Sequence, residues 1–187
     1  MTRTYTLKRR AEQQADTRRR IVESALALHG ELGPARTSFS QVAERAGVQR
    51  NTFYSHFPDE RSLLLACSGL SLERDPLPDA DAWRDIDDRV ERLTTGLSAI
   101  YAWYARNADL AGCVLRDAES SEVVRDIVEL RWGPFNAAYD DVLGSGLAPP
   151  ARAMLRLALQ YATWRSLVRD SALDADEAVR AMVGAIA

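Results

Sequence analysis

The segment over residues 38–57 (SFSQVAERAGVQRNTFYSHF) constrains the fold more than any other part of the chain. Ser38 followed by Gln41 is a capping box, which marks the start of a short helix with an apolar face. Gly47 ends that helix, because glycine readily adopts the left-handed conformation that a helix end needs. A second short helix is expected over residues 49–56, with polar side chains on one side. The segment therefore predicts two short helices joined by a tight turn, a helix–turn–helix.

Helical periodicity extends along the rest of the chain, and strand signals are scarce. A first helix is expected over residues 17–32, capped by Asp16 or Thr17 and ended by Gly33 and Pro34. The other expected helices span residues 59–70, 81–107, 109–116, 120–143, 150–171 and 175–185, with a kink or division at Gly133-Pro134. We predict an all-α fold of about nine helices, a three-helix head followed by a helical-bundle body.

Composition excludes several classes of protein. The chain has 187 residues, of which 47% are hydrophobic and 27% charged, which is typical of a globular protein. Its longest apolar run, residues 99–105, is far shorter than the roughly 20 residues of a membrane-spanning helix. The basic N-terminus has no apolar stretch behind it, so it is not a secretory signal. Two cysteines, Cys67 and Cys113, are too few for a disulfide framework, which favours a reducing compartment and a cytoplasmic location.

Charge is distributed unevenly along the chain. Residues 1–20 contain 7 Lys/Arg against 2 Asp/Glu, whereas residues 61–187 contain 14 Lys/Arg against 20 Asp/Glu. A basic head on an acidic body favours a polyanionic partner for the head alone. A solvated basic tail is the alternative interpretation.

The second short helix of the helix–turn–helix presents polar side chains suited to the major groove of DNA. Arg50 can bind a guanine edge through two hydrogen bonds, and Asn51 can bind an adenine edge in the same way. Thr52, the next residue in the sequence, is a further polar side chain of this helix. A phosphate contact or a solvated side chain is the alternative for each of these residues.

The sequence at this point resembles the DNA-binding head of tetracycline-repressor (TetR) family regulators. The resemblance is carried by residues 20–33 (RIVESALALHGELG), 37–57 and 58–64, which include Ala46-Gly47-Val48, Thr52-Phe53-Tyr54, His56-Phe57 and Leu63-Leu64. It implies a basic flexible arm over residues 1–16, a DNA-binding domain over 17–62 and a ligand-binding and dimerisation domain over 63–187. It also implies a dimeric repressor that binds a palindromic operator on double-stranded DNA and is released by a ligand.

The resemblance extends to contacts with the DNA backbone. Tyr54 and His56 correspond to a pair that contacts phosphate, or else they pack against the head. Ser38 would direct the N-terminus of its helix at a phosphate, with the Thr37 hydroxyl beside it. Gln49 replaces the usual Ser or Thr cap, which weakens that contact, and Arg61 substitutes for a lysine absent at Glu60. Further cations, either tracking the backbone or free in solvent, are Arg3, Lys8, Arg9, Arg10, Arg18 and Arg19.

Three features of the sequence each allow a structural or a functional interpretation: a histidine in the head, an acidic cluster and a cysteine in the body. His29 stands where the family usually has Phe, and we interpret it as a packed histidine. The acidic residues Asp85, Asp87, Asp88 and Glu91 favour a charge–dipole interaction at a helix start over an effector site. Cys113 is a secondary candidate for a redox sensor.

The body is rich in aromatic side chains, and the resemblance implies an effector pocket among its helices. A small apolar or aromatic effector is expected, with no other cofactor and no metal. The candidate lining residues, each of which could equally be plain core, are Tyr101, Tyr104, Phe135, Tyr139 and Trp164. The resemblance further implies a homodimer through the last two long helices, over about residues 150–186.

Three other classes of protein fit the sequence less well. An enzyme is disfavoured because the histidines and cysteines have no metal-ligand spacing and no phosphate loop or nucleophile motif is present. An adaptor that has lost DNA binding conflicts with the polar residues Arg50, Asn51 and Thr52. A DNA-packaging protein conflicts with the acidic body, because non-specific binding depends on phosphate neutralisation.

Overall fold

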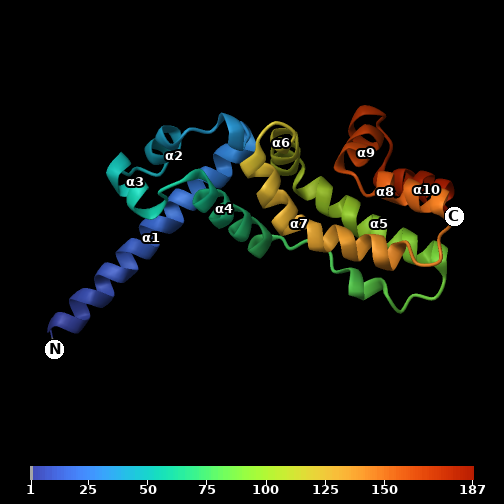
Figure 1. Cartoon of the computed structure of the whole chain (residues 1–187), viewed down its shortest axis with the longest axis horizontal. Coiled ribbons are helices and arrows are strands. Elements are labelled where there is room, and N and C mark those ends of the chain that lie inside the picture. Colours follow the sequence, from blue (N-terminus) through green and yellow to red (C-terminus); the bar gives the residue numbers. More distant parts are fainter. Residues whose placement is uncertain (1) are drawn as a thin grey trace. The chain divides into compact units, whose positions relative to one another are not determined.

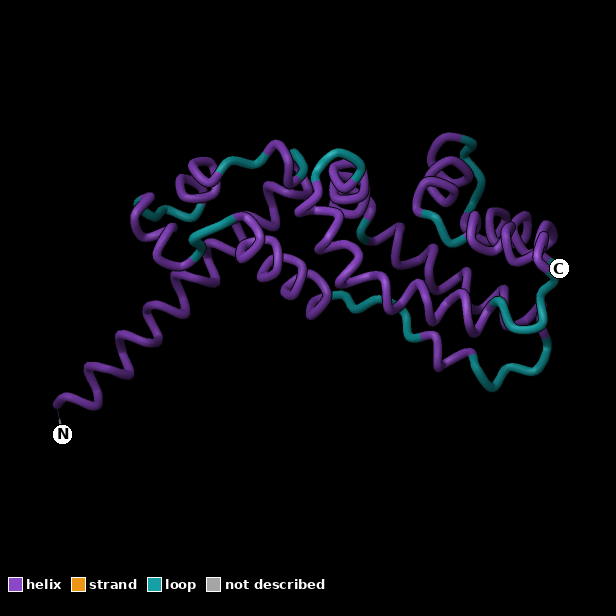
Figure 2. The backbone as a smooth tube through the Cα atoms, in the orientation of Figure 1, coloured by secondary structure: helices purple, strands orange, loops and turns teal. Residues whose placement is uncertain are grey.

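The computed structural model describes residues 2–187, with side chains from Lys8 onward. Over this range every regular element is a helix, as Figure 2 shows, so the all-α prediction is confirmed. Ten α-helices occur among these residues, one more than the sequence predicts. No helix in the described range combines the length and the apolar character needed to cross a membrane.

The first of two compact units consists of Met1–Asp75 and Cys113–Val128. Its helices, labelled in Figure 1, are α1 (Thr2–Glu31), α2 (Phe39–Arg45), α3 (Arg50–His56), α4 (Glu60–Arg74), the end of α6 (Ala108–Ala118) and the start of α7 (Glu122–Leu143). The expected domain boundary after residue 62 lies inside α4, all of which belongs to this unit.

One apolar core holds α1 to α4 together. Phe53 is fully buried at its centre, with its ring 4.9 Å from that of Phe39 and 6.0 Å from that of Phe57. The side chains that α1, α2 and α4 contribute are Ile21, Val22, Ala25, Leu28, Val42, Ala43, Ala46, Leu63 and Cys67. The periodic apolar residues of the helix–turn–helix therefore face inward, as the sequence predicts.

Local signals determine both ends of α2. Ser38 and Gln41 form the expected capping box: the Gln41 backbone N–H donates to Ser38 Oγ, and the Ser38 backbone N–H donates to Gln41 Oε1. Gly47 has φ +64°, the left-handed conformation expected at the turn. At the start of α3, Gln49 occupies the cap position without a side-chain hydrogen bond, which confirms the expectation that it caps poorly.

Polar contacts with α6 fix the turn after α1. Gly33 has φ +97°, and a Cβ there would overlap the Arg116 guanidinium and the Asp117 carboxylate. Arg116 Nη2 donates to the Leu32 carbonyl over 3.0 Å, and the Ala35 backbone N–H donates to Asp117 Oδ2 over 2.8 Å. Asp117 is only 5% exposed and pairs with Arg116 at 2.8 Å. This network holds the backbone that leads from α1 into α2.

The second compact unit consists of Pro76–Gly112 and Glu129–Ala187. It contains α5 (Arg89–Arg106), α8 (Pro149–Ala158), α9 (Tyr161–Arg165) and α10 (Ala175–Ile186), with a 3-10 turn over Ala80–Trp83 and a π-helical turn over Ser166–Asp170. α10 packs on α5 and α8 and buries Ala178, Val179, Met182, Val183 and Ile186.

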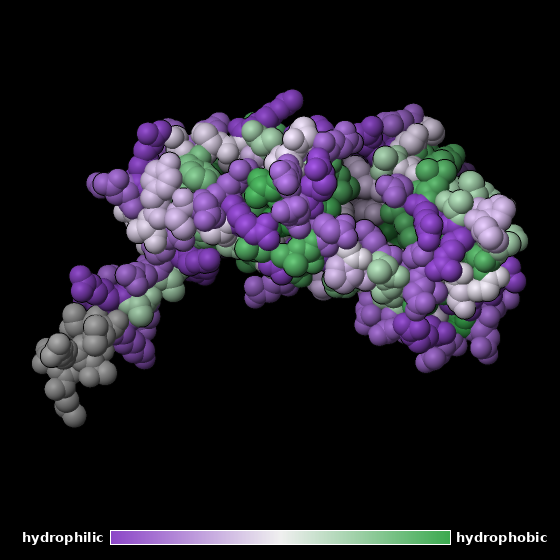
Figure 3. All heavy atoms as spheres, viewed as in Figure 1, coloured by the Kyte–Doolittle hydropathy of each residue, from purple (hydrophilic) through white to green (hydrophobic). Residues whose placement is uncertain are grey.

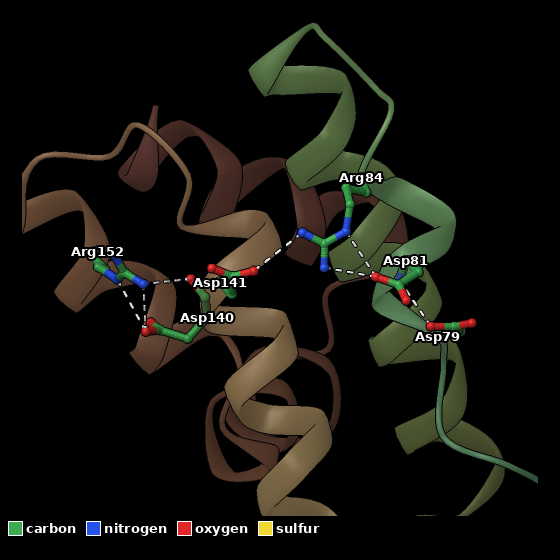
Figure 4. Close-up of polar contacts among 6 residues, drawn as sticks. All are labelled: Asp79, Asp81, Arg84, Asp140, Asp141 and Arg152. Atoms are coloured by element: carbon green, nitrogen blue, oxygen red, sulfur yellow. Dashed lines mark hydrogen bonds and ion pairs between the residues drawn. The ribbon is translucent and has the colours of Figure 1, made fainter.

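Ion pairs fasten α7 to its neighbours in the second unit (Figure 4). The Arg84 guanidinium lies between Asp81 at 2.8 Å and Asp141 of α7 at 3.4 Å. Arg152 of α8 pairs with Asp140 of α7 at 2.9 Å. Because most of these side chains are exposed, each pair contributes little to stability. The Arg152–Asp140 pair links α7 to α8, and the Arg84–Asp141 pair links α7 to the 3-10 turn over Ala80–Trp83.

Two expected helix starts are wrong. The first helix begins at Thr2 rather than Thr17, because residues 2–16 contain no helix breaker, and Thr17 Oγ1 donates back to the Gln13 carbonyl over 2.9 Å instead of capping. Of the flexible arm expected over residues 1–16, residues 2–16 therefore continue α1. The helix expected from Asp81 begins at Arg89.

That later start has a local cause. The carboxylate of Asp88 caps α5 by accepting from the Glu91 backbone N–H over 2.8 Å. The acidic cluster thus lies at the start of a helix, where negative charge is favourable. Further along, Gly133 and Pro134 do not divide α7, which runs as one helix.

The long helix expected over residues 150–171 is also wrong, because the chain breaks after α8. The Tyr101 hydroxyl donates to the Ala158 carbonyl over 3.1 Å, and the Tyr104 hydroxyl donates to the Leu159 carbonyl over 2.7 Å. If the helix continued, these carbonyls at the end of α8 would accept hydrogen bonds from backbone N–H groups further along the chain. Instead they accept from two tyrosine hydroxyls of α5. Two short helices, α8 and α9, and the π-helical turn replace the expected long helix, whereas α10 confirms the helix expected over residues 175–185.

Candidate functional site

α3 carries most of the side chains that the sequence predicts to contact DNA. Phe53 fixes the helix to the core, and on the outer side Tyr54 is 49% exposed. The other exposed residues at this surface are Gln49, Arg50, Asn51 and Ser55, and Thr52 and His56 are half-buried. The structure thus presents a short polar helix face, while the contact made by each residue stays a prediction.

Neighbouring side chains already orient two residues of this face. The Arg50 guanidinium donates to the hydroxyl of Ser40 on α2. The Tyr54 ring makes edge contacts with Phe39 and Phe53, at centroid distances of 5.8 and 5.7 Å. Tyr54 is therefore both packed and accessible, so its two interpretations from the sequence remain compatible.

The hydroxyl groups at the start of α2 have partners inside the protein. Thr37 Oγ1 donates to the Gly33 carbonyl over 2.8 Å, and Ser38 Oγ donates to Gln41 Oε1 over 2.8 Å. A phosphate oxygen accepts hydrogen bonds but cannot donate them. Each hydroxyl would therefore have to exchange its partner before it could bind phosphate.

Arg18 and Arg61, two cations expected at the DNA backbone, also contact other residues of the head. The Arg18 guanidinium lies 4.6 Å from the centre of the Phe57 ring, a cation–π distance. Arg61 Nη1 lies 3.3 Å from Asp126 Oδ2, and both side chains are about half exposed. Both arginines remain accessible, and their DNA contacts stay predictions.

The sequence did not indicate the role of Arg20, whose side chain hydrogen-bonds to the turn of the helix–turn–helix. Its Nη1 donates to the Ala46 carbonyl over 3.2 Å, where α2 ends. The last carbonyls of a helix lack intrahelical donors, so some donor at this point was predictable. Which residue supplies it was not, because Arg18, Arg19 and Arg20 form a single run of like charge.

His29 is buried in the head, as the packed interpretation expects. Only 4% of the residue is exposed, and burial lowers the pKa of its imidazole to about 4, with the charge of Asp117 acting in the opposite direction. Its ring borders a cavity of about 270 Å³ that Thr37, Phe39 and Glu60 also line. The imidazole is therefore neutral near pH 7.

The expected effector residues lie in the second unit, and four of the five are buried. Tyr104 is central: its ring lies 6.0 Å from that of Trp164, and the charge of Tyr101 adds to burial in raising the pKa of its hydroxyl. Burial also raises the pKa of Tyr139, with a contribution from the charge of Tyr104. Phe135 is half-buried. The tyrosines thus share one interior region, although their role toward a ligand stays a prediction.

Comparison with known proteins supports the resemblance. Residues 21–67 match the family model described as bacterial regulatory proteins, tetR family. An HTH-type transcriptional regulator of Mycobacterium tuberculosis is 31% identical over 142 residues, which are 74% of this chain and 66% of that protein. The chain belongs to the TetR family. It spans about two thirds of the length of these curated relatives.

Other comparisons concern shorter segments or the fold alone. The transcriptional repressor KstR of Mycolicibacterium smegmatis is 36% identical over 64 residues, 34% of this chain and 31% of that protein. The transcriptional regulator FadR of Bacillus subtilis, solved with stearoyl-CoA, has a TM-score of 0.63 at 18% identity, covering 89% of this chain and 96% of that one. AibR, solved with isovaleryl coenzyme A and operator DNA, has a TM-score of 0.64 at 18% identity over 90% and 96% of the two chains.

Proposed function

We propose that this TetR-family protein is a sequence-specific transcriptional repressor that binds a palindromic operator as a homodimer and is released by a small molecule. The observation that carries the proposal is the outer face of α3. Phe53 fixes the helix to the core, and Arg50 and Asn51 are exposed on it. A guanidinium and an amide presented in this way have the donor and acceptor patterns that read guanine and adenine edges.

Polar contacts anchor both ends of α2, the helix that precedes the recognition helix α3. Arg20 holds the end of α2, and Arg116 with Asp117 holds the turn that precedes it. A recognition helix must keep its angle to the core if its side chains are to meet particular base edges. Hydrogen bonds depend on direction, whereas apolar packing does not. These polar contacts therefore define the orientation of the helices more closely than apolar packing alone.

Selection of bound sequences from a randomised duplex pool tests this function. We expect enrichment of a palindrome at about 150 mM salt, with half-sites about 34–36 Å apart, because one head covers only one half-site. Failure to enrich any sequence, before and after bound small molecules are removed by refolding, would contradict the proposal.

The homodimer would form through the outward faces of α8 and α10, within the segment over residues 150–186. Most apolar side chains of these helices, among them Leu155 and Met182, are buried within the unit. The outward faces of α8 and α10 carry other side chains. Leu157 of α8 is 50% exposed, and α10 exposes the small residues Ala181, Gly184 and Ala185, spaced three and four apart. Small residues on one helix face allow close approach of a second copy.

The effector would bind among the aromatic residues of the second unit. FadR with stearoyl-CoA and AibR with isovaleryl coenzyme A show that related folds hold acyl-coenzyme A molecules. In this chain Tyr101, Tyr104 and Tyr139 supply apolar rings, with hydroxyls that already bind backbone carbonyls. We therefore propose an apolar or aromatic effector that enters by displacing some of these hydroxyl contacts.

A further inference from the structure

The cavity beside His29 lies in the head, where the end of α1 meets the starts of α2 and α4. Its volume is about 270 Å³, and the apolar part of its wall consists of Phe39, Leu63 and Leu64. On the face of the molecule in Figure 3, hydrophobic residues of the head likewise reach the surface between hydrophilic ones. Pockets for drug-sized ligands measure about 300–1,000 Å³, so this cavity suits a smaller organic molecule.

His29 is a buried polar side chain that borders this cavity without a hydrogen-bond partner. Only 4% of the residue is exposed, and its imidazole hydrogen-bonds to no other group in the described part of the chain. A neutral imidazole carries one N–H donor and one nitrogen that accepts. Because buried polar groups nearly always have partners, the unused capacity of His29 points to a ligand in the cavity.

The other polar groups in the wall between α1 and α2 can accept hydrogen bonds but have already used their donors. The Thr37 hydroxyl donates to the Gly33 carbonyl, and the Ser38 hydroxyl donates to the Gln41 side chain. The backbone N–H groups of Ala35, Thr37 and Ser38 also donate to acceptors within the protein. Each hydroxyl oxygen has two lone pairs, so this part of the wall suits a ligand that donates hydrogen bonds.

Charge near the cavity is negative. The Glu60 carboxylate is exposed at its edge, and the charge of Asp117 acts on the His29 ring. No Lys or Arg is among the described residues that line the cavity. A cation is therefore favoured there over an anion of the same size.

We propose that this cavity is a small-molecule site for an organic ammonium ion with an apolar body. An ammonium group has three donors and no acceptor, which matches the acceptors of His29, Thr37 and Glu60. The apolar body would pack on Phe39 and Leu63. All these residues belong to the first unit, whereas the proposed effector residues belong to the second, so the inference does not depend on the proposed function.

Histidine NMR signals of the full chain provide the test, with phenethylammonium as the probe. The chain has 2 histidines, and His56 of α3 does not line the cavity, so its signals are an internal reference. The probe should shift the His29 signals saturably and leave those of His56 unchanged. Its affinity should exceed that of phenethyl alcohol, which has the same size without the charge, at least about tenfold. No saturable shift of His29 at millimolar probe, or equal affinity for the two molecules, would overturn the inference.

Two variants separate a specific site from a general effect of charge. Glu60→Gln keeps the shape of an exposed side chain and removes its charge, so probe affinity should fall about tenfold. Glu44→Gln removes the same charge from an exposed position of α2 outside the cavity, and probe affinity should stay at the wild-type value. Equal probe affinities for the two variants would overturn the inference. Duplex selection tests the proposed function separately, so either can fail without the other.

Discussion

At the scale of single residues, Gly33 determines whether the end of α1 can meet α6. Its φ of +97° and the absence of a Cβ allow Arg116 and Asp117 to reach the backbone around it. Gly30 is a contrast: a Cβ there has nothing within 4 Å and φ is not positive. The two glycines therefore have opposite requirements although only three positions separate them.

We predict opposite effects of alanine at these two glycines. Gly33→Ala should lower the free energy of unfolding by about 2 kcal/mol or more, through backbone strain and loss of the Asp117 contacts. Gly30→Ala should raise it by about 0.5–1 kcal/mol, because alanine is favoured inside a helix. Urea unfolding of both variants measures these changes, and equal effects would show that the Gly33 turn is not constrained.

A second prediction at the residue scale concerns His29 and the loss of folding stability at acid pH. Its folded pKa of about 4 lies below the unfolded value of about 6.5, so the unfolded chain binds the proton first as pH falls. Stability from the neutral imidazole is complete above pH 6.5 and declines between pH 6.5 and 4, by up to about 3 kcal/mol. The groups facing the ring are Asp117 and, across the cavity, Glu60.

The variant His29→Phe isolates this contribution, since the adjacent cavity leaves room for the larger ring. Urea unfolding at pH 7, 6, 5 and 4 should show a shallower loss of stability in the variant than in the wild type. Parallel pH profiles would mean that carboxylates alone account for the acid sensitivity.

Residues whose position depends on local sequence were predictable. Ser38 and Gly47 lie as expected, because a cap and a turn are each determined within a few residues. Arg20 and Asp117 were not predictable in this way. The Asp117 carboxylate meets Ala35 from 82 positions away, and only the tertiary fold brings these atoms together.

At the scale of elements, the same distinction separates the helices of the head from α8 and α9. The sequence predicts both ends of α2 and the starts of α3 and α4 nearly to the residue, since a cap or a glycine marks each of these points. α4 extends four residues beyond its expected end at Leu70. The sequence predicts one long helix over residues 150–171, because the apolar pattern there is continuous. The break arises from hydroxyl groups on α5, which no pattern within that segment reveals.

α10 supports a prediction on dimerisation. Gly184→Arg should leave the subunit folded, because a side chain at this position points into open space. If a second copy packs on the small residues of α10, the arginine should weaken the dimer at least tenfold. Sedimentation across a concentration series measures this effect. Asn136→Arg, at an exposed position of α7, is the control. A dimer unaffected by Gly184→Arg would place the interface elsewhere.

At the scale of the whole molecule, positive and negative charge are concentrated in different parts of the sequence. Residues 1–60 carry 10 Lys/Arg against 7 Asp/Glu, whereas the remainder is acidic. The cations of the head can thus attract DNA while the acidic remainder limits non-specific binding. A repressor released by a ligand also requires that effector and operator weaken each other's binding by the same factor.

That reciprocity can be measured with acyl-coenzyme A probes. If stearoyl-CoA or isovaleryl-CoA binds, as detected by tryptophan fluorescence, operator affinity should fall by about 5- to 150-fold, and operator should weaken probe binding equally. Phe135→Ala should reduce probe binding while leaving operator affinity without the probe unchanged. A probe that binds without changing operator affinity would contradict the proposed release mechanism.

The most direct test of the account is to repeat the duplex selection with Arg50→Ala. If α3 reads bases, the variant should keep the palindrome but lose preference at one position of each half-site, at a cost of about 1–3 kcal/mol. Uniform weakening across all sequences, with every base preference retained, would contradict base reading by Arg50 and reduce it to a phosphate contact.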